Sequence, residues 1–318
     1  MCPSATEIIM EAFLQEELED ENLKCLGNAG SGYISEGFKY RTGKGELIFV
    51  KINRKAEAQQ MFNGEYRSLE ILRAANIVQV PKPIKVINLP EGGSALIMEH
   101  IEINSLSSQC GKLGELMARL HLLNSEMLEK SKKLEKYVGK ADKLTPVTQF
   151  GFDTTTCYGY IPMDNTWQDN WGNFYSRKLK QQMDILETVH SDKEARELWS
   201  ELQMKLPAFF DNLNNIQPAL MHGDLWKKNV GENEYGPVIF DPASFYGHSE
   251  FDLALTRTFG GFGASFFDNY HQLIPQAPGF RQRADLYELF FYLNHWNQFG
   301  TSYRDQSISA FCRLLRIE

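Results

Sequence analysis

The pattern of apolar and polar positions in the first hundred residues predicts a small sheet flanked by helices. Strand-like apolar runs occupy residues 47–52, 84–87 and 95–100, and a turn joins the last two into a hairpin. Between the first two runs, apolar positions recur every three or four residues and predict a helix over residues 55–75, with one face formed by Ala58, Met61, Glu65, Leu69 and Leu72. An acidic amphipathic helix over residues 5–21 is expected to cover this lobe through a stripe of Ile8, Ile9, Ala12 and Phe13.

From about residue 105 the spacing becomes that of helices. Residues 105–128 carry apolar side chains at intervals of four and three. Further helices are predicted over residues 174–190, 194–213 and 286–299. Residues 150–171 are aromatic, contain glycine and have no clear period, which indicates an insert or loop close to a substrate. We therefore expect an α+β protein of two lobes: a small N-terminal lobe over residues 1–101, with an antiparallel sheet and a helix, and a larger, mostly helical lobe over residues 102–318.

Composition narrows the class of protein. The 318 residues are 42% hydrophobic and 12% aromatic, enough for a sizeable core, and the net charge of −8 argues against a nucleic-acid or anionic-membrane partner. No apolar run approaches transmembrane length, and the acidic N-terminal segment excludes a signal peptide and disfavours a mitochondrial presequence. Five scattered cysteines without a C-x-x-C spacing indicate neither a zinc site nor a disulfide framework, so a cytoplasmic location is expected.

The candidate chemistry is concentrated between residues 220 and 242. A His-Gly-Asp sequence ends at Asp224, Asn229 follows five positions later, and the short apolar run 238–240 ends at Asp241. Phosphoryl transfer from ATP needs such a set: a carboxylate that orients a hydroxyl and takes its proton, and oxygen ligands that hold Mg²⁺ against the phosphates. The spacing therefore predicts Asp224 as the catalytic base and Asn229 and Asp241 as metal ligands.

A second interpretation of this stretch stays open from the spacing alone. A glycine–aspartate turn on a surface loop, with Asn229 as its cap, would have the same residues at the same positions, and the five-residue spacing between aspartate and asparagine recurs by chance. The strand that ends at Asp241 at the right distance favours the kinase interpretation.

Two charged residues upstream fit that interpretation. Lys51 lies within an apolar strand and Glu65 within the apolar face of a helix, and a partly buried carboxylate needs a partner. Lys51 supplies one, and in a kinase it would also pair with the α- and β-phosphates of ATP. The alternatives are a lysine that snorkels at a sheet edge and a glutamate in water at the rim of its helix.

Two further segments are candidates for binding a nucleotide through the backbone. In the first, Gly30 and Gly32 would let N–H groups approach phosphates, although an ordinary glycine-rich hairpin is the favoured reading of that segment taken alone. No G-K-[ST] follows, so it is not a Walker A loop. In the second, at the exit from the sheet, Met98, Glu99 and Ile101 would bind adenine if this segment is a kinase hinge.

The sequence resembles the fructosamine kinase, or ketosamine kinase, family over nearly its whole length. The segments that carry the resemblance are I-S-E-G at 34–37, F-V-K at 49–51, M-F-N-G-E at 61–65, H-G-D-L-W at 222–226, D-P-A-S-F-Y-G-H-S-E at 241–250 and Y-L-N-H-W-N at 292–297. The ten-residue segment is far more specific than the general kinase motifs. The resemblance implies a bilobal protein-kinase-like fold of the aminoglycoside and choline kinase type.

The resemblance also implies an activity. Members of the family use ATP and Mg²⁺ to phosphorylate the third-carbon hydroxyl of ketosamines, which are fructosamine, ribulosamine and psicosamine adducts on proteins or small amines. The phosphorylated adduct is unstable and frees the amine, so the implied role is deglycation of cytosolic proteins and small amines.

Individual positions follow from the same resemblance. Trp226 and His295 would contact the sugar adduct, although an ordinary packing tryptophan remains an alternative for Trp226. Two positions depart from the family pattern: members usually carry Ser-Gly where this chain has Lys227 and Lys228, and many carry cysteine where it has Tyr33. Regulation through a thiol at that last position is therefore unsupported.

Two other functions stay open from the sequence. One is a kinase for another amine-bearing small molecule, such as an aminoglycoside or choline. The other is a kinase-shaped scaffold that binds partners without catalysis, which the complete set of Lys51, Glu65, Asp224, Asn229 and Asp241 disfavours. The preferred sugar epimer, the protein targets and the oligomeric state are left open.

Overall fold

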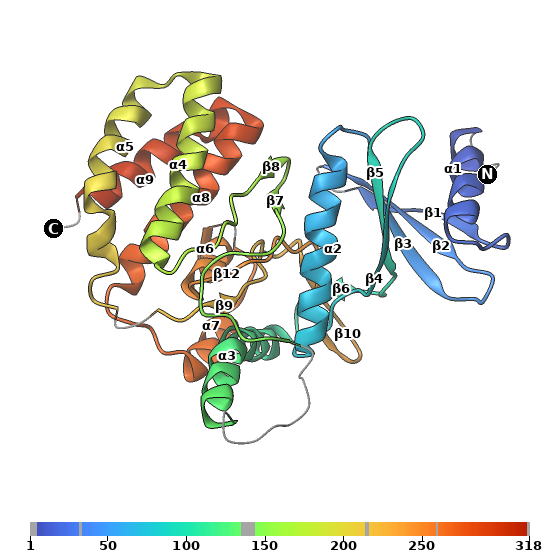
Figure 1. Cartoon of the computed structure of the whole chain (residues 1–318), viewed down its shortest axis with the longest axis horizontal. Helices are drawn as coiled ribbons and strands as arrows, with labels where there is room; N and C mark the ends of the chain where they lie inside the picture. Colours follow the sequence, from blue (N-terminus) through green and yellow to red (C-terminus); the bar gives the residue numbers. More distant parts are fainter. Residues whose placement is uncertain (1–4, 32–33, 135–143, 214–215, 259, 317–318) are drawn as a thin grey trace.

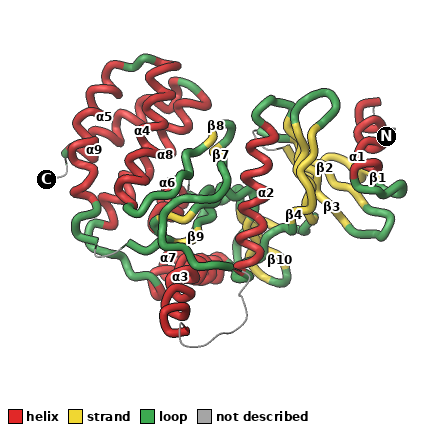
Figure 2. The backbone as a smooth tube through the Cα atoms, in the orientation of Figure 1, coloured by secondary structure: helices red, strands yellow, loops and turns green. Residues whose placement is uncertain are grey.

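Strands gather in the N-terminal part of the molecule and helices dominate the rest (Figures 1 and 2). The computed structural model describes residues 5–31, 34–134, 144–213, 216–258 and 260–316. The predicted phosphate-binding Gly32 and the departure at Tyr33 lie outside the described residues. No described helix is long and apolar enough to cross a membrane.

The N-terminal part is built on a five-stranded antiparallel sheet with the order β1-β2-β3-β5-β4. The strands are β1 (Lys24–Ser31), β2 (Glu36–Arg41), β3 (Leu47–Asn53), β4 (Pro83–Asn88) and β5 (Ser94–Glu99). Helix α1 (Ala5–Glu17) lies on one face, and α2 (Ala58–Ala75) lies on the other, between the sheet and the helical part (Figure 1). The three strands and the helix predicted between residues 47 and 100 are confirmed to within a few residues.

The buried face of α1 differs from the predicted stripe. Leu14 is fully buried and Met10 and Phe13 pack against the same core, whereas Ile9 is 62% exposed and Ala12 is also exposed. The predicted stripe is therefore wrong at Ile9 and Ala12. Acidic and apolar residues are interleaved over only 13 residues of helix, so the periodicity has too few turns to fix which side faces the sheet.

The C-terminal part packs its helices around an aromatic core. The helices are α3 (Cys110–Leu134), α4 (Trp171–His190), α5 (Lys193–Lys205), α6 (Glu250–Thr258), α7 (Ala264–Leu273), α8 (Phe280–Phe299) and α9 (Arg304–Leu315), with short 3₁₀ turns at Leu206–Phe209 and Thr301–Tyr303. The Trp171 ring stacks on Tyr175, and its indole N–H donates to the Tyr287 hydroxyl at 2.9 Å. The four predicted helices are present as α3, α4, α5 and α8, although the one predicted over residues 194–213 ends at Lys205 and is followed by a 3₁₀ turn. Most aromatic residues near the C-terminus are core residues.

Helix α3 begins at Cys110 rather than at Ser105 for a local reason. The chain first forms β6 (Asn104–Ser105), which pairs with β10 (Val230–Asn233). The backbone N–H groups of Ser107 and Gln109 then each donate to the Glu232 carboxylate at 2.9 Å. These backbone hydrogen bonds lower the pKa of Glu232 to about 2, so a carboxylate from a distant strand caps the start of α3.

Several short strands connect the catalytic region to its surroundings. They are β7 (Cys157–Tyr158), β8 (Ile161–Pro162), β9 (Ala219–Leu220), β11 (Gly236–Ile239) and β12 (Tyr246–Gly247). Strands β7 and β8 form a hairpin inside the aromatic stretch 150–171, and β10 and β11 form a second hairpin shortly before Asp241.

The two parts share contacts across their boundary. Gln79 forms a parallel bridge with Val238, and Ser244 donates its backbone N–H to the hydroxyl of Ser68 on α2 at 3.0 Å. The buried residues of α2 belong to the same core cluster as the C-terminal helices. Helix α2 is thus held between the sheet and the helical part, and the division between residues 101 and 102 stays a prediction.

Candidate active site

A cavity of about 1230 Å³ is lined by residues of both parts of the molecule. Its walls come from the β1–β2 hairpin, strand β3, residues 98–105 and the loops that follow β9 and β11. Small-molecule pockets usually measure about 300–1,000 Å³, so this cavity has room for two ligands together. Every described candidate from the sequence lines it except His295.

The ion pair predicted between Lys51 and Glu65 is present, and both residues line the cavity. The Lys51 ammonium lies 3.0 and 2.9 Å from the two Glu65 oxygens and 3.0 Å from Oδ1 of Asp241. Alternation along β3 directs Lys51 towards α2, while its neighbour Val50 is buried in the core beneath α1. One ammonium is therefore shared between two carboxylates that come from opposite parts of the molecule.

Burial and this sharing shift the pKa values of the pair. Burial would lower the pKa of Lys51, but Asp241 and Glu65 outweigh it and raise the pKa above its ordinary value. Burial raises the pKa of Glu65; Lys51 opposes this rise and Asp241 adds to it. Lys51 therefore stays charged at neutral pH.

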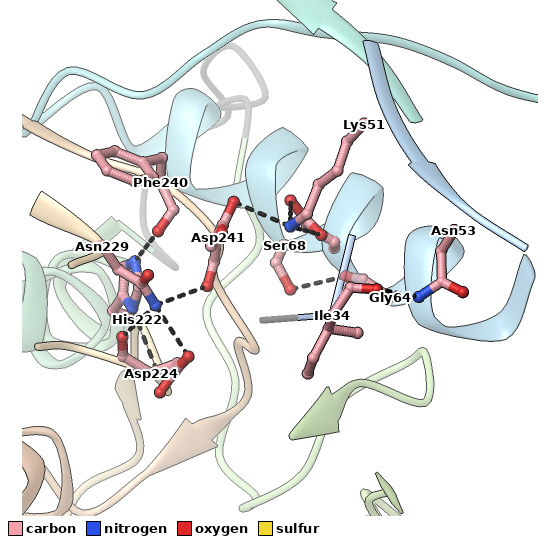
Figure 3. Close-up of polar contacts among 11 residues, drawn as sticks. Ile34, Lys51, Asn53, Gly64, Ser68, His222, Asp224, Asn229, Phe240 and Asp241 are labelled. Carbon is pink, nitrogen blue, oxygen red and sulfur yellow. Dashed lines mark hydrogen bonds and ion pairs between the residues drawn. The ribbon is translucent and has the colours of Figure 1, made fainter. Parts of the chain in front are cut away.

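The catalytic loop brings Asp224 and Asn229 together. The Asn229 amide donates to Oδ2 of Asp224 at 2.8 Å and to the Asp224 carbonyl oxygen at 3.0 Å (Figure 3). Burial raises the pKa of Asp224 to about 7, against the hydrogen bond from Asn229, which lowers it. A carboxylate with a pKa near neutrality suits a general base.

The same hydrogen bonds orient the predicted metal ligand. Because the nitrogen of the Asn229 amide is bound to Asp224, its oxygen Oδ1 is the atom that a cation would meet. Among the described residues no group of three or more His, Cys, Asp or Glu side chains could hold a metal ion. An amide oxygen and one carboxylate fit Mg²⁺, which usually completes its shell with phosphate oxygens and water.

The backbone of the loop takes its shape at Gly223. This residue has φ +88°, and a Cβ there would collide with the carbonyl oxygen of Ala243. His222 next to it donates from Nε2 to the Phe240 carbonyl oxygen at 3.0 Å and accepts at Nδ1 from the N–H of Asp224 at 3.2 Å. Burial lowers the pKa of His222, so the imidazole is neutral and fixed in one tautomer.

Asp252 at the start of α6 braces this loop. Its two oxygens accept the backbone N–H groups of His222 at 2.7 Å and Gly223 at 2.8 Å. Oδ2 also lies 3.1 Å from Nε2 of His121, whose other nitrogen is 2.7 Å from the Tyr270 hydroxyl. His121 thus has a structural role, because it belongs to the support of the loop.

Asp241 adopts a backbone conformation that few residues favour. Its φ is +53°, in the left-handed region where aspartate is tolerated better than most side chains. This turn follows directly after β11 and Phe240, and the Asp241 carboxylate reaches Lys51. Strain of this kind at the end of a buried strand is common where a ligand is bound.

The β7–β8 hairpin contributes to the site although no single residue of it was predicted. Cys157 and Gly159 line the cavity. The buried Tyr158 hydroxyl donates to the carbonyl oxygen of Gly223. The Tyr160 hydroxyl donates to the carbonyl oxygen of Ile34, beside the glycine-rich hairpin, at 3.2 Å. The only signal in the sequence is an aromatic stretch without periodicity, which indicates that the segment lies near the substrate but not what its individual residues do.

The predicted nucleotide contacts at the exit from the sheet are only partly available. Met98, Glu99 and Ile101 line the cavity, as does Gly30 on the β1–β2 hairpin. The backbone N–H of Glu99 already donates to the Lys82 carbonyl oxygen at 2.8 Å. An adenine bound here would therefore meet other backbone groups than the N–H of Glu99.

His295 is not brought to the cavity, although Trp226 is. His295 lies on α8, where Nδ1 is 2.7 Å from the Phe291 carbonyl oxygen and the ring packs against Phe299 and Tyr303. Burial lowers its pKa. The structure therefore gives no support to the predicted sugar contact of His295, because its turn of α8 faces other aromatic residues.

Comparison with known proteins assigns the chain to a family. The sequence model of the family described as fructosamine kinase matches residues 6–317. The chain belongs to the fructosamine kinase family. It is 51% identical over 309 residues to the mouse protein Ketosamine-3-kinase, covering 96% of this chain and 99% of that one. It is 34% identical over 294 residues to the Arabidopsis thaliana chloroplastic Protein-ribulosamine 3-kinase, covering 92% and 83%.

Solved structures agree with the fold expected for a fructosamine kinase. A crystal structure from Haemophilus somnus 129PT, provisionally named a fructosamine-3-kinase, superposes with a TM-score of 0.74 at 22% identity and covers 96% of this chain and 97% of that one. An aminoglycoside phosphotransferase superposes with a TM-score of 0.60 at 16% identity over 98% and 99%. The expected bilobal kinase-like fold of the aminoglycoside phosphotransferase type is thereby confirmed.

Proposed function

We propose that this protein transfers the γ-phosphoryl group of ATP to the third-carbon hydroxyl of ketosamines. The observation that carries the reaction class is the meeting of one ammonium, three carboxylates and one amide in a single cavity: Lys51, Glu65, Asp224, Asp241 and Asn229. The acceptor class is supported by the names of the mouse and plant relatives, a ketosamine-3-kinase and a ribulosamine 3-kinase.

In this proposal Asp224 is the base. Its carboxylate accepts the proton of the sugar hydroxyl as the hydroxyl attacks the γ-phosphorus in line, and the β-phosphate of ATP leaves as part of ADP. Asn229 holds the carboxylate in place through the 2.8 Å hydrogen bond. Lys51, fixed by Glu65, would bind the phosphates, and the β1–β2 hairpin with Gly30 would cover them.

Asn229 and Asp241 would hold Mg²⁺, the proposed cofactor. The ion neutralises charge on the phosphates when it is bound. The amide oxygen of Asn229 and the carboxylate of Asp241 are the donor types that this cation prefers. Asp241 now pairs with Lys51 at 3.0 Å, so the ammonium and the cation would share one carboxylate.

The wider role follows from the acceptor. A ketosamine phosphorylated on the third carbon breaks down and releases its amine, so the proposed role is deglycation of proteins and small amines. Trp226 in the cavity wall would stack on the sugar chain. We propose the cytoplasm as the location. This proposal rests on the sequence alone, and the plant relative does not support it because its name places it in the chloroplast. The preferred epimer, the targets and the oligomeric state stay open.

The test is phosphate transfer by the Asp224→Asn variant. The amide cannot take the hydroxyl proton, so turnover of a ribulosamine, psicosamine or fructosamine with Mg-ATP should fall about 10²–10⁴-fold. Nucleotide binding, measured by calorimetry, should change little. Asp268→Asn, at an exposed position of α7, is the matched control and should behave as the wild type. Full activity of Asp224→Asn would refute the role of Asp224, and a wild type that phosphorylates no ketosamine would refute the function.

A further inference from the structure

Lys227 and Lys228 have no part in the reaction proposed above, although they lie on the catalytic loop. They stand between the proposed base Asp224 and the proposed metal ligand Asn229. Both side chains are exposed, and both residues line the cavity. Two adjacent positive charges at the rim of a cavity, in a chain with a net charge of −8, point to a negatively charged ligand.

The charge balance of the cavity supports this reading. Lys39 pairs with Glu102, and Lys51 is shared by the two carboxylates described above. By contrast, within the described part of the chain no carboxylate oxygen lies within 4.0 Å of the Lys227 ammonium. The positive charge of Lys227 is thus available at the cavity rim.

Neighbouring groups hold both side chains in place. The stem of Lys227 fills the space beside Gly261, where a Cβ would overlap the Lys227 methylenes, and Gly261 itself has φ +104°. The Lys228 ammonium lies 5.4 Å from the centre of the Trp226 ring, within the range of a cation–π contact. Neighbouring groups therefore position the stem of Lys227 and the ammonium of Lys228.

We propose that Lys227 and Lys228 select ketosamines whose amine carries a negative charge close to the sugar. This inference rests on the proposed function. The reacting hydroxyl must reach Asp224 inside the cavity, so the amine that bears the sugar lies towards the rim, where the two lysines are exposed. An adduct on the α-amino group of an amino acid places a carboxylate two bonds from that nitrogen. The phosphates, by contrast, already have Lys51 and the glycine-rich hairpin.

The test compares two acceptors of nearly equal size. One is a ribulose adduct on the α-amine of an amino acid, and the other is the same adduct on the corresponding amino-acid amide. A contact between unit charges in water is worth about fivefold in kcat/KM, so the wild type should prefer the carboxylate form by about 3- to 10-fold. The preference should shrink as ionic strength rises, because both charges are exposed.

Variants of the lysines separate charge from packing. Lys227→Met keeps the stem against Gly261 and removes the charge, so the preference should fall towards one, while Lys227→Arg should retain it. Lys228→Met should reduce the preference in the same way. Lys44→Met, at an exposed turn away from the cavity, is the control for net charge and should leave the preference unchanged.

Three results would overturn the inference. The wild type could show no preference between the two acceptors, the preference could survive both methionine substitutions, or those substitutions could raise only the KM for Mg-ATP, which would assign the lysines to the nucleotide. Failure of the proposed function would look different, since neither acceptor would then be phosphorylated.

Discussion

Replacing Asp252 by asparagine tests whether the catalytic loop depends on a brace outside the chemistry. Asp252 is 1% exposed, and its oxygens accept from the N–H groups of His222 and Gly223 at 2.7 and 2.8 Å. An asparagine keeps one acceptor oxygen but presents an NH₂ group to one of these two donors. Asparagine is nearly isosteric with aspartate, so packing changes little, and any change in stability or rate comes from the altered hydrogen bonds.

The magnitude follows from those contacts. A buried N–H left without an acceptor costs about 1–3 kcal/mol, and loss of the negative charge weakens the remaining hydrogen bonds by about 1 kcal/mol. We expect the free energy of unfolding of Asp252→Asn to fall by about 2–4 kcal/mol. Gly223 directly precedes Asp224, and a displacement of about 1 Å at the base costs about 10²-fold in rate. We therefore expect kcat to fall about 10- to 100-fold.

Two measurements check this prediction. Urea denaturation followed by tryptophan fluorescence gives the free energy of unfolding, and ADP release with a ketosamine gives kcat at temperatures where the variant is folded. Asp268→Asn, an exposed aspartate of α7, is the control and should stay within 0.5 kcal/mol, about the spread of surface substitutions. An Asp252→Asn protein with wild-type stability and kcat would contradict the brace.

Three further substitutions probe other contacts. Lys51→Met leaves the Glu65 and Asp241 carboxylates without their shared cation. In steady-state kinetics the KM for Mg-ATP should therefore rise and kcat should fall about 10²-fold or more. Unchanged kinetics would show that Lys51 has no role in the reaction. Tyr160→Phe deletes one hydroxyl that bonds to the backbone beside the glycine-rich hairpin. The KM for Mg-ATP should rise about 2- to 10-fold, and the melting temperature should fall by no more than a few degrees. An effect on stability alone would contradict a role of Tyr160 in nucleotide binding. Lys178 is fully buried, and burial lowers its pKa to about 7, whereas in the unfolded chain it stays protonated up to about pH 10. Unfolding therefore takes up a proton between these pH values. The free energy of unfolding should rise with pH there by up to about 1.4 kcal/mol per pH unit. Lys178→Met should flatten that rise in urea titrations between about pH 7 and 9, and an unchanged slope would contradict the assignment.

The parts of the site that the sequence predicted well depend on short-range patterns. The position of Lys51 in β3 follows from strand alternation, and that of Glu65 from helical periodicity, so their ion pair could be expected before any coordinates. The spacing from Asp224 to Asn229 keeps both on one loop, which makes their contact local as well.

The parts that failed or were missed depend on tertiary packing. Nothing in the sequence around His295 reveals that its turn of α8 faces Phe299 and Tyr303 rather than the cavity. Likewise, Tyr158 bonds to Gly223, which is 65 positions away in the chain, and no periodicity encodes that pairing. Where a helix or hairpin docks depends on all its neighbours together, and this is information that a single sequence does not display.

The β7–β8 hairpin has a consequence for how the two substrates bind. Tyr158 contacts the loop that carries the proposed base, Tyr160 contacts the hairpin proposed to cover the phosphates, and only Gly159 separates them. Gly159 has φ +60°, and the backbone N–H of Tyr160 next to it donates to Oε1 of Gln298 on α8 at 3.3 Å, which ties the tip of the hairpin to that helix. Occupancy of one half of the cavity should therefore change affinity in the other, and thermodynamic reciprocity requires the same factor in both directions. An acceptor analogue that tightens ATP fivefold would itself be held fivefold more tightly by the ATP-bound enzyme.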